Sequence, residues 1–137
     1  MFLVAMVLTP VVDQGIKYAV RTRLGRRSVA IGVFGELRMV SSEMWTLRLR
    51  PQLSLSRMWL LWFVGAAAAV GIAAMLPASA WAMGLLVGGA FSHAIETSVR
   101  GSICDYVCLR FWPAFNAADL AITVGALGLA GSALRLI

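Results

Sequence analysis

The sequence has few charged residues: only 13% of its 137 side chains are charged, whereas 61% are hydrophobic. Soluble globular domains carry about 25% charged residues, so this composition excludes a water-soluble domain. A chain this apolar also has ample surface to bury, which excludes an intrinsically disordered protein. Because one bilayer crossing takes about 20 apolar residues, we expect a single integral membrane domain over residues 1–137.

Cysteine and histidine are scarce as well. The chain has two cysteines, Cys104 and Cys108, and one histidine, His93. Two cysteines are too few for a disulfide framework, and no neighbouring ligands complete a zinc site. We therefore expect both cysteines to be small apolar residues in the wall of the fold.

Acidic side chains are also few, and the formal net charge is +6. The basic excess comes from one polar segment, residues 21–57, which holds Arg21, Arg23, Arg26, Arg27, Arg38, Arg48, Arg50 and Arg57 against Glu36 and Glu43. Arginines beside membrane spans typically contact lipid headgroups. The aromatic residues that interleave with basic ones in single-strand binders are missing here. We therefore expect membrane lipid as a partner and no nucleic acid.

Four stretches are long and apolar enough to cross a membrane, approximately residues 1–20, 58–76, 79–97 and 114–135. The second has no charged residue and begins with two tryptophans, which are typical of the membrane interface. The third contains several glycines, including Gly88, whose small size permits close contact between helices. The first carries Asp13 and Lys17 and has no basic leader, so we expect a retained span rather than a cleaved signal peptide.

The only long polar stretch, residues 21–57, separates the first two spans. Apolar and polar side chains alternate over residues 45–50 and again over 53–56, and less regularly over 28–40. A period of two is typical of half-exposed strands. The sequence therefore predicts a mainly α membrane fold, with four transmembrane helices and a small sheet on the membrane surface between helices 1 and 2.

Four spans place both chain ends on one side of the membrane. The predicted sheet and the polar stretch over residues 98–113 then lie together on the other side. Because arginine in short loops favours the cytoplasm, the arginine distribution by itself predicts a cytoplasmic sheet.

Ionisable side chains in or near the hydrocarbon are costly, so each is a functional candidate unless a partner explains it. Asp13 and Lys17 are four residues apart on one helix face, where they can neutralise each other. Asp119 follows Asn116 by three residues, the spacing of a helix N-cap and its N3 carboxylate. Asp105 lies in the polar stretch before the fourth span, where a solvated loop acid is the simplest interpretation.

The alternative is that Asp105 and Asp119 meet at the membrane boundary. Two carboxyls in contact cannot both ionise, so one keeps a proton while the other deprotonates a water for attack on a peptide carbonyl. This is the chemistry of an aspartic protease. A spacing of 14 residues does not by itself show that the two side chains meet.

Three segments together carry a family resemblance: Asp13-Gln14-x-x-Lys17, GGAFSHAIETSVRGSICDYV over residues 88–107, and FWPAFNAADLAITVGA over residues 111–126. They resemble the bacterial lipoprotein signal peptidase family, signal peptidase II. In that family the first span carries D-Q-x-x-K. The third carries G-G-A-x-G-N-x-x-D-R before a G-x-x-x-D-F-like stretch, and the fourth opens with F-N-x-A-D. The resemblance implies four transmembrane helices and a periplasmic β-cradle after the first.

Matched position by position, the resemblance implies that Asp105 and Asp119 are catalytic and that Asn116 lies near them, with Asp13 and Lys17 as the pair of the first helix. The implied reaction is cleavage of a lipid-modified prolipoprotein before its diacylglyceryl cysteine. The implied location is the bacterial cytoplasmic (inner) membrane with the catalytic side periplasmic, and we follow this orientation over the arginine distribution. No metal or cofactor is implied.

The chain departs from the family pattern around the aspartates. Ser92-His93 replaces Gly-Asn, and Glu96-Thr97 replaces Asp-Arg. The cradle motif N-x-G-x-A-F is absent, and residues 40–45 are the nearest stretch by position. Glu96 could still orient the pair as the family's aspartate would. His93 is either a catalytic group or a buried hydrogen-bonding residue.

Two functions remain open at this point. The retained Asp105 and Asp119 favour an active membrane aspartic endopeptidase that processes lipoprotein precursors. The rewritten segments at residues 92–97 and 40–46 favour a non-catalytic relative, a structural or accessory subunit that binds lipid, a lipoprotein or a larger membrane complex.

Overall fold

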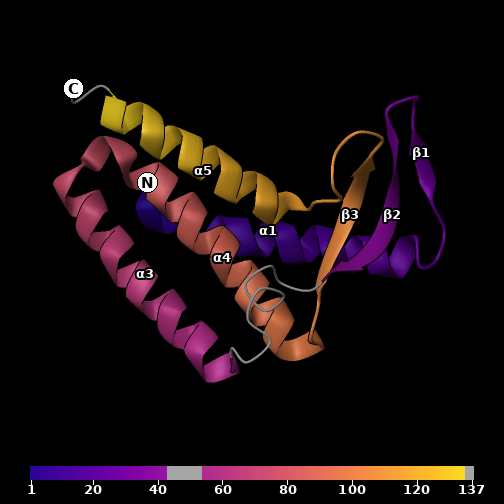
Figure 1. Cartoon of the computed structure of the whole chain (residues 1–137), viewed down its shortest axis with the longest axis horizontal. Coiled ribbons are helices and arrows are strands. Elements are labelled where there is room, and N and C mark those ends of the chain that lie inside the picture. Colours follow the sequence, from indigo (N-terminus) through magenta and orange to yellow (C-terminus); the bar gives the residue numbers. More distant parts are fainter. Residues whose placement is uncertain (43–53, 135–137) are drawn as a thin grey trace.

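The computed structural model describes residues 1–42 and 54–134. Its elements in chain order are α1 (Phe2–Arg23), β1 (Val29–Ile31), β2 (Gly35–Ser42), α3 (Leu55–Met75), the 3-10 helix η1 (Pro77–Ser79), α4 (Ala80–Arg100), β3 (Ile103–Leu109) and α5 (Ala117–Leu134). The long helices run side by side and the sheet lies at one end of them, whereas the start of α1 and the end of α5 lie towards the other end (Figure 1).

The four long helices are each long and apolar enough to cross a membrane. Their outward side chains are largely apolar and exposed, for example Phe63 at 62% and Leu127 at 68%. Such faces are stable only where lipid covers them. The predicted fold class, a membrane protein with four spanning helices and a small sheet, is confirmed.

Helix α4 is the most buried of the four and packs against α1, α3 and α5. Glycines make this close packing possible. A Cβ at Gly88 would lie 2.6 Å from the carbonyl oxygen of Met6 in α1, and a Cβ at Gly89 would lie 2.8 Å from that of Ala118 in α5. Both neighbours lie so close to α4 that only glycine fits at these positions.

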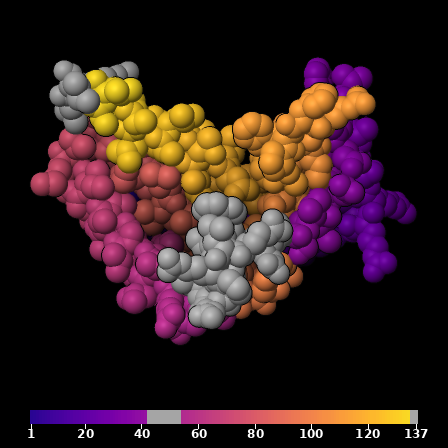
Figure 2. Space-filling view, in the orientation of Figure 1, coloured from indigo at the N-terminus to yellow at the C-terminus, as the bar shows by residue number. Residues whose placement is uncertain are grey.

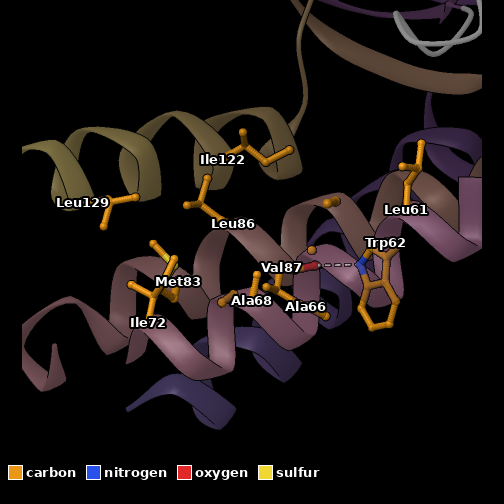
Figure 3. Close-up of a pocket in the computed structure, with 13 residues that line it drawn as sticks. Leu61, Trp62, Ala66, Ala68, Ile72, Met83, Leu86, Val87, Ile122 and Leu129 are labelled. Carbon is orange, nitrogen blue, oxygen red and sulfur yellow. Dashed lines mark hydrogen bonds between the residues drawn. The ribbon is translucent and has the colours of Figure 1, made fainter. Parts of the chain in front are cut away.

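An apolar cavity of about 450 Å³ lies between α3, α4 and α5. The atoms of α4 lie at the bottom of a depression between α3 and α5 (Figure 2). Met83 lies towards one end of the cavity and Trp62 at the other, where the Trp62 indole N–H donates to the carbonyl oxygen of Val87 at 3.3 Å (Figure 3).

The sheet is antiparallel in the order β1-β2-β3, and Val40 of β2 faces Asp105 of β3. Its third strand follows α4, so the sheet draws on both polar stretches of the chain and not only on the one between the first two spanning helices. The sequence prediction of a polar loop over this region was wrong. The reason is burial: residues 103–106 are all buried, so no alternation of apolar and polar residues marks the strand.

The other strand predictions have mixed outcomes. β1 and β2 form within residues 28–42, where the alternation is irregular. Leu55 and Ser56, predicted as part of a strand, begin α3 instead, with Ser54 as the N-cap that accepts a hydrogen bond from the Arg57 backbone N–H. The alternating residues 45–50 and Leu53 lie outside the described residues.

Candidate active site

The candidate site is built around the start of α5. Asn116 caps this helix: its side-chain oxygen accepts from the Asp119 backbone N–H, and Asp119 Oδ2 accepts from the Asn116 backbone N–H, both at 3.0 Å. This is a reciprocal capping box. The cap that the spacing of three residues predicts is therefore present. The second carboxylate oxygen of Asp119 is not part of the box.

Asp105 lies beside this cap. The Asn116 side-chain amide donates to Asp105 Oδ1 at 2.6 Å and to the Cys104 carbonyl oxygen at 3.4 Å. The Asp105 side chain belongs to a buried strand and the residue is 7% exposed, so the interpretation as a solvated loop acid was wrong. Asn116 therefore contacts both candidate aspartates.

His93 approaches the same cap from α4. Its Nε2 lies 3.3 Å from Asn116 Oδ1 and 3.5 Å from Asp119 Oδ1. Because the Asn116 amide nitrogen is directed at Asp105, its oxygen faces His93, and an amide oxygen can only accept. In this arrangement Nε2 donates to Asn116 Oδ1, and it also faces Asp119 Oδ1. His93 is buried, at 8% exposure.

A buried ionic cluster connects α1 to α4. Lys17 Nζ lies 2.7 Å from Asp13 Oδ2 and 2.6 Å from Glu96 Oε2. The other oxygen of Glu96 pairs with Arg21. The predicted pair of Asp13 and Lys17 is present. Among the described residues, Glu96 contacts Lys17 and Arg21 of α1 and not the candidate aspartates.

Asp13 also reaches the start of α5. Its Oδ1 accepts from the Ala118 backbone N–H at 3.1 Å, and its Oδ2 accepts from the Ser92 hydroxyl at 2.6 Å. Ser92 in turn accepts from the Gln14 side-chain amide at 2.8 Å. The contacts of Ser92 and Arg21 were not predicted from the sequence. For Arg21 a signal existed, because its spacing of four residues from Lys17 places both on one helix face.

Tyr106 supplies a further contact to α5: its hydroxyl oxygen accepts from the Ala117 backbone N–H at 2.9 Å. Burial raises the pKa of Tyr106 to about 12, so the phenol stays neutral. Burial also raises the pKa of the Cys104 thiol, which fits the small, inert wall residue that the sequence predicts.

A shallow cavity of about 280 Å³ opens beside Asp119. Its other lining residues are Leu109, Trp112, Phe115, Leu120 and Thr123. The Asp119 side chain is 38% exposed, so one candidate carboxylate is accessible from an apolar groove while Asp105 is buried. Within residues 1–42 and 54–134, no three His, Cys, Asp or Glu side chains are grouped to hold a metal ion.

A family model described as signal peptidase (SPase) II matches residues 5–135. A protein named lipoprotein signal peptidase from Methylorubrum extorquens (strain PA1) is 38% identical over 86 residues, which are 56% of this chain and 50% of that protein. One of the same name from Cellvibrio japonicus (strain Ueda107) is 32% identical over 103 residues, 61% of each chain. The matches thus span half to three-fifths of these relatives.

Two solved structures, each titled a bacterial membrane enzyme structure, share the fold. They give TM-scores of 0.79 and 0.80 at 20% and 21% sequence identity. Each similarity covers 96% of this chain, and they cover 86% and 91% of the solved chains. Identity at this level shows the fold alone.

Proposed function

The chain belongs to the signal peptidase II family, and we propose that it is a membrane aspartic endopeptidase. Its substrate is a lipid-modified prolipoprotein, which it cleaves before the diacylglyceryl cysteine. One observation carries this proposal: Asp105 and Asp119, from different elements, both contact Asn116 at the start of α5. Neither local sequence nor helix capping requires Asp105 to lie there.

The two carboxyls differ in a way that suits aspartic-protease chemistry. Asp105 is buried and bonded to an amide, whereas Asp119 borders the apolar groove. One carboxylate removes a proton from water, whose oxygen attacks the scissile carbonyl carbon, while the protonated carboxyl donates a hydrogen bond to the carbonyl oxygen. A proton then passes to the leaving nitrogen as the C–N bond breaks.

The surrounding residues orient this pair. Asn116 fixes Asp105 through its amide, and His93 Nε2 faces Asp119 Oδ1 at 3.5 Å. Asp13 and Lys17 act through the start of α5, because Asp13 accepts from Ala118. In this proposal His93 is a positioning residue. The family pattern has an asparagine at this position.

The apolar groove and the exposed apolar helix faces suit a substrate that arrives through the membrane. The site lies at the sheet end of the helices, so both the peptide and its lipid can reach it at the membrane boundary. We place this end on the periplasmic side of the bacterial cytoplasmic membrane.

The test is complementation of a strain depleted of its own lipoprotein signal peptidase. Wild type is compared with Asp105→Asn and Asp119→Asn at matched membrane abundance, and Glu36→Gln, a carboxyl-to-amide change in the sheet, is the control. Wild type and the control should process prolipoprotein, and both aspartate variants should lose at least about 10³-fold in rate. Wild-type protein that accumulates but leaves prolipoprotein uncut would overturn the proposal in favour of a non-catalytic subunit.

A further inference from the structure

Four ionisable side chains form a closed cluster between α1 and α4. Asp13 and Lys17 are 0% exposed and Glu96 is 1% exposed, whereas the Arg21 side chain is 20% exposed. The cluster holds two carboxylates and two cations. It is therefore neutral only when Arg21 is counted.

Lys17 cannot balance the cluster alone. Its single ammonium bridges Asp13 and Glu96 at 2.7 and 2.6 Å, so one positive charge serves two negative ones. An unbalanced charge that is taken out of water is strongly disfavoured. Arg21 supplies the missing charge through its contact with the other oxygen of Glu96.

The guanidinium beside Glu96 comes from α1. The motif that α4 resembles has an arginine directly after its acid, and this chain has Thr97 there. Thr97 is 3% exposed, and its hydroxyl has no hydrogen-bond partner among the described residues. In this chain the residue after Glu96 therefore supplies no charge to the cluster.

The cluster is linked to the candidate active site through Asp13. Asp13 Oδ1 accepts from the Ala118 backbone N–H at 3.1 Å, and Ala118 directly precedes Asp119. If Lys17 were drawn towards an unbalanced Glu96, Asp13 would lose the charge that keeps its carboxylate in place. The start of α5, with Asn116 and Asp119, would then lose one of its fixed contacts.

We propose that Arg21 is a positioning residue for the candidate active site. It neutralises Glu96, so that Lys17 stays paired with Asp13 and Asp13 holds the start of α5. The effect on cleavage rests on the proposed function, whereas the effect on α5 does not.

The first experiment compares Arg21→Gln with Arg21→Lys and with Arg23→Gln, which removes an exposed arginine two residues further along the same helix. Cleavage of a lipid-modified peptide is measured in proteoliposomes at equal amounts of folded protein. Arg21→Gln should lower kcat about tenfold with little change in KM, because the catalytic groups and not the groove are disturbed. Arg21→Lys should restore most of kcat, and Arg23→Gln should match wild type.

The second experiment removes both charges of the pair. The double variant Arg21→Gln, Glu96→Gln leaves Asp13 and Lys17 as a neutral pair, so it should recover most of the kcat lost in Arg21→Gln. Amide exchange of the segment containing Ala118, followed by mass spectrometry, should be faster in Arg21→Gln and close to wild type in the double variant. A role in overall stability alone would leave kcat per folded protein unchanged in Arg21→Gln.

The outcomes separate this proposal from the proposed function. If Arg21→Gln matches Arg23→Gln in kcat and in exchange, or if the double variant recovers neither, the role of Arg21 is overturned. If wild type itself cleaves nothing, the proposed function fails, and the exchange rates still decide the role of Arg21. If Arg21→Gln does not accumulate, the double variant decides the question. A double variant whose amide exchange matches wild type supports the proposal, and a double variant that also fails to accumulate overturns it.

Discussion

At the residue scale, the first three backbone N–H groups of α5 each donate to a different side chain. Ala117 donates to Tyr106, Ala118 to Asp13 and Asp119 to Asn116. Helix starts leave such donors unpaired, and they are usually satisfied by a local cap. Here two of the three acceptors come from β3 and α1, so the cap also fixes the position of α5 relative to both elements.

Only part of this arrangement could be predicted from the sequence. The cap of Asn116 and Asp119 depends on a spacing of three residues, which is visible in any helix start. The contact of Asp13 with Ala118 joins residues 105 positions apart, and no local pattern records it. The family resemblance named Asp13 without showing what it contacts.

The neutral phenol of Tyr106 leads to a prediction about pH. Tyr106 is 5% exposed and its pKa is raised to about 12 by burial, while Tyr18 is 70% exposed. In the unfolded chain Tyr106 releases its proton near pH 10, so stability should fall as the pH rises from about 10 to 12. Absorbance titration of the folded protein in detergent should show a phenol step near pH 12, and Tyr106→Phe should remove it. A wild-type titration without a step that depends on Tyr106 at this pH would contradict the expectation.

At the element scale, the helices were predictable and one strand was not. An apolar run of about 20 residues marks a spanning helix whatever it packs against. A strand is marked by alternation only if one of its faces is exposed. β3 is buried over residues 103–106 because it lies between β2 and the helices, so its position depends on tertiary contacts that the sequence does not display.

The glycines of α4 allow a test of helix packing. At Gly88 a Cβ would lie 2.6 Å from the Met6 carbonyl oxygen, whereas at Gly71 of α3 it would meet no atom within 4 Å. We expect Gly88→Ala to lower the free energy of unfolding by about 1–3 kcal/mol, as overpacking does. Gly71→Ala should be neutral or slightly stabilising, since alanine favours helix. Unfolding in mixed micelles measures both, and equal values for the two variants would refute close packing at Gly88.

At the scale of the whole molecule, the candidate site and the sheet share one end of the helices, and the η1 turn and the end of α5 lie towards the other (Figure 1). The arginines of the sheet end favour a cytoplasmic location by their number. Not all of them are free charges, however. Arg21 is committed to buried Glu96, and Arg38 pairs with Glu36 at 3.2 Å. The net charge of this end is therefore smaller than its number of arginines.

Cysteine labelling tests the proposed periplasmic location of the sheet end. In a background of Cys104→Ser and Cys108→Ser, Ser28→Cys places an exposed thiol before β1, and Ala78→Cys places a matched one in η1 at the opposite end. Because α4 between the two ends spans 21 residues, about 30 Å, the two thiols lie on opposite sides of a bilayer. An impermeant maleimide added to intact spheroplasts should label Ser28→Cys, and it should reach Ala78→Cys only after permeabilisation. The reverse pattern would place the candidate site in the cytoplasm, as the arginines predict, and would overturn the proposed periplasmic location.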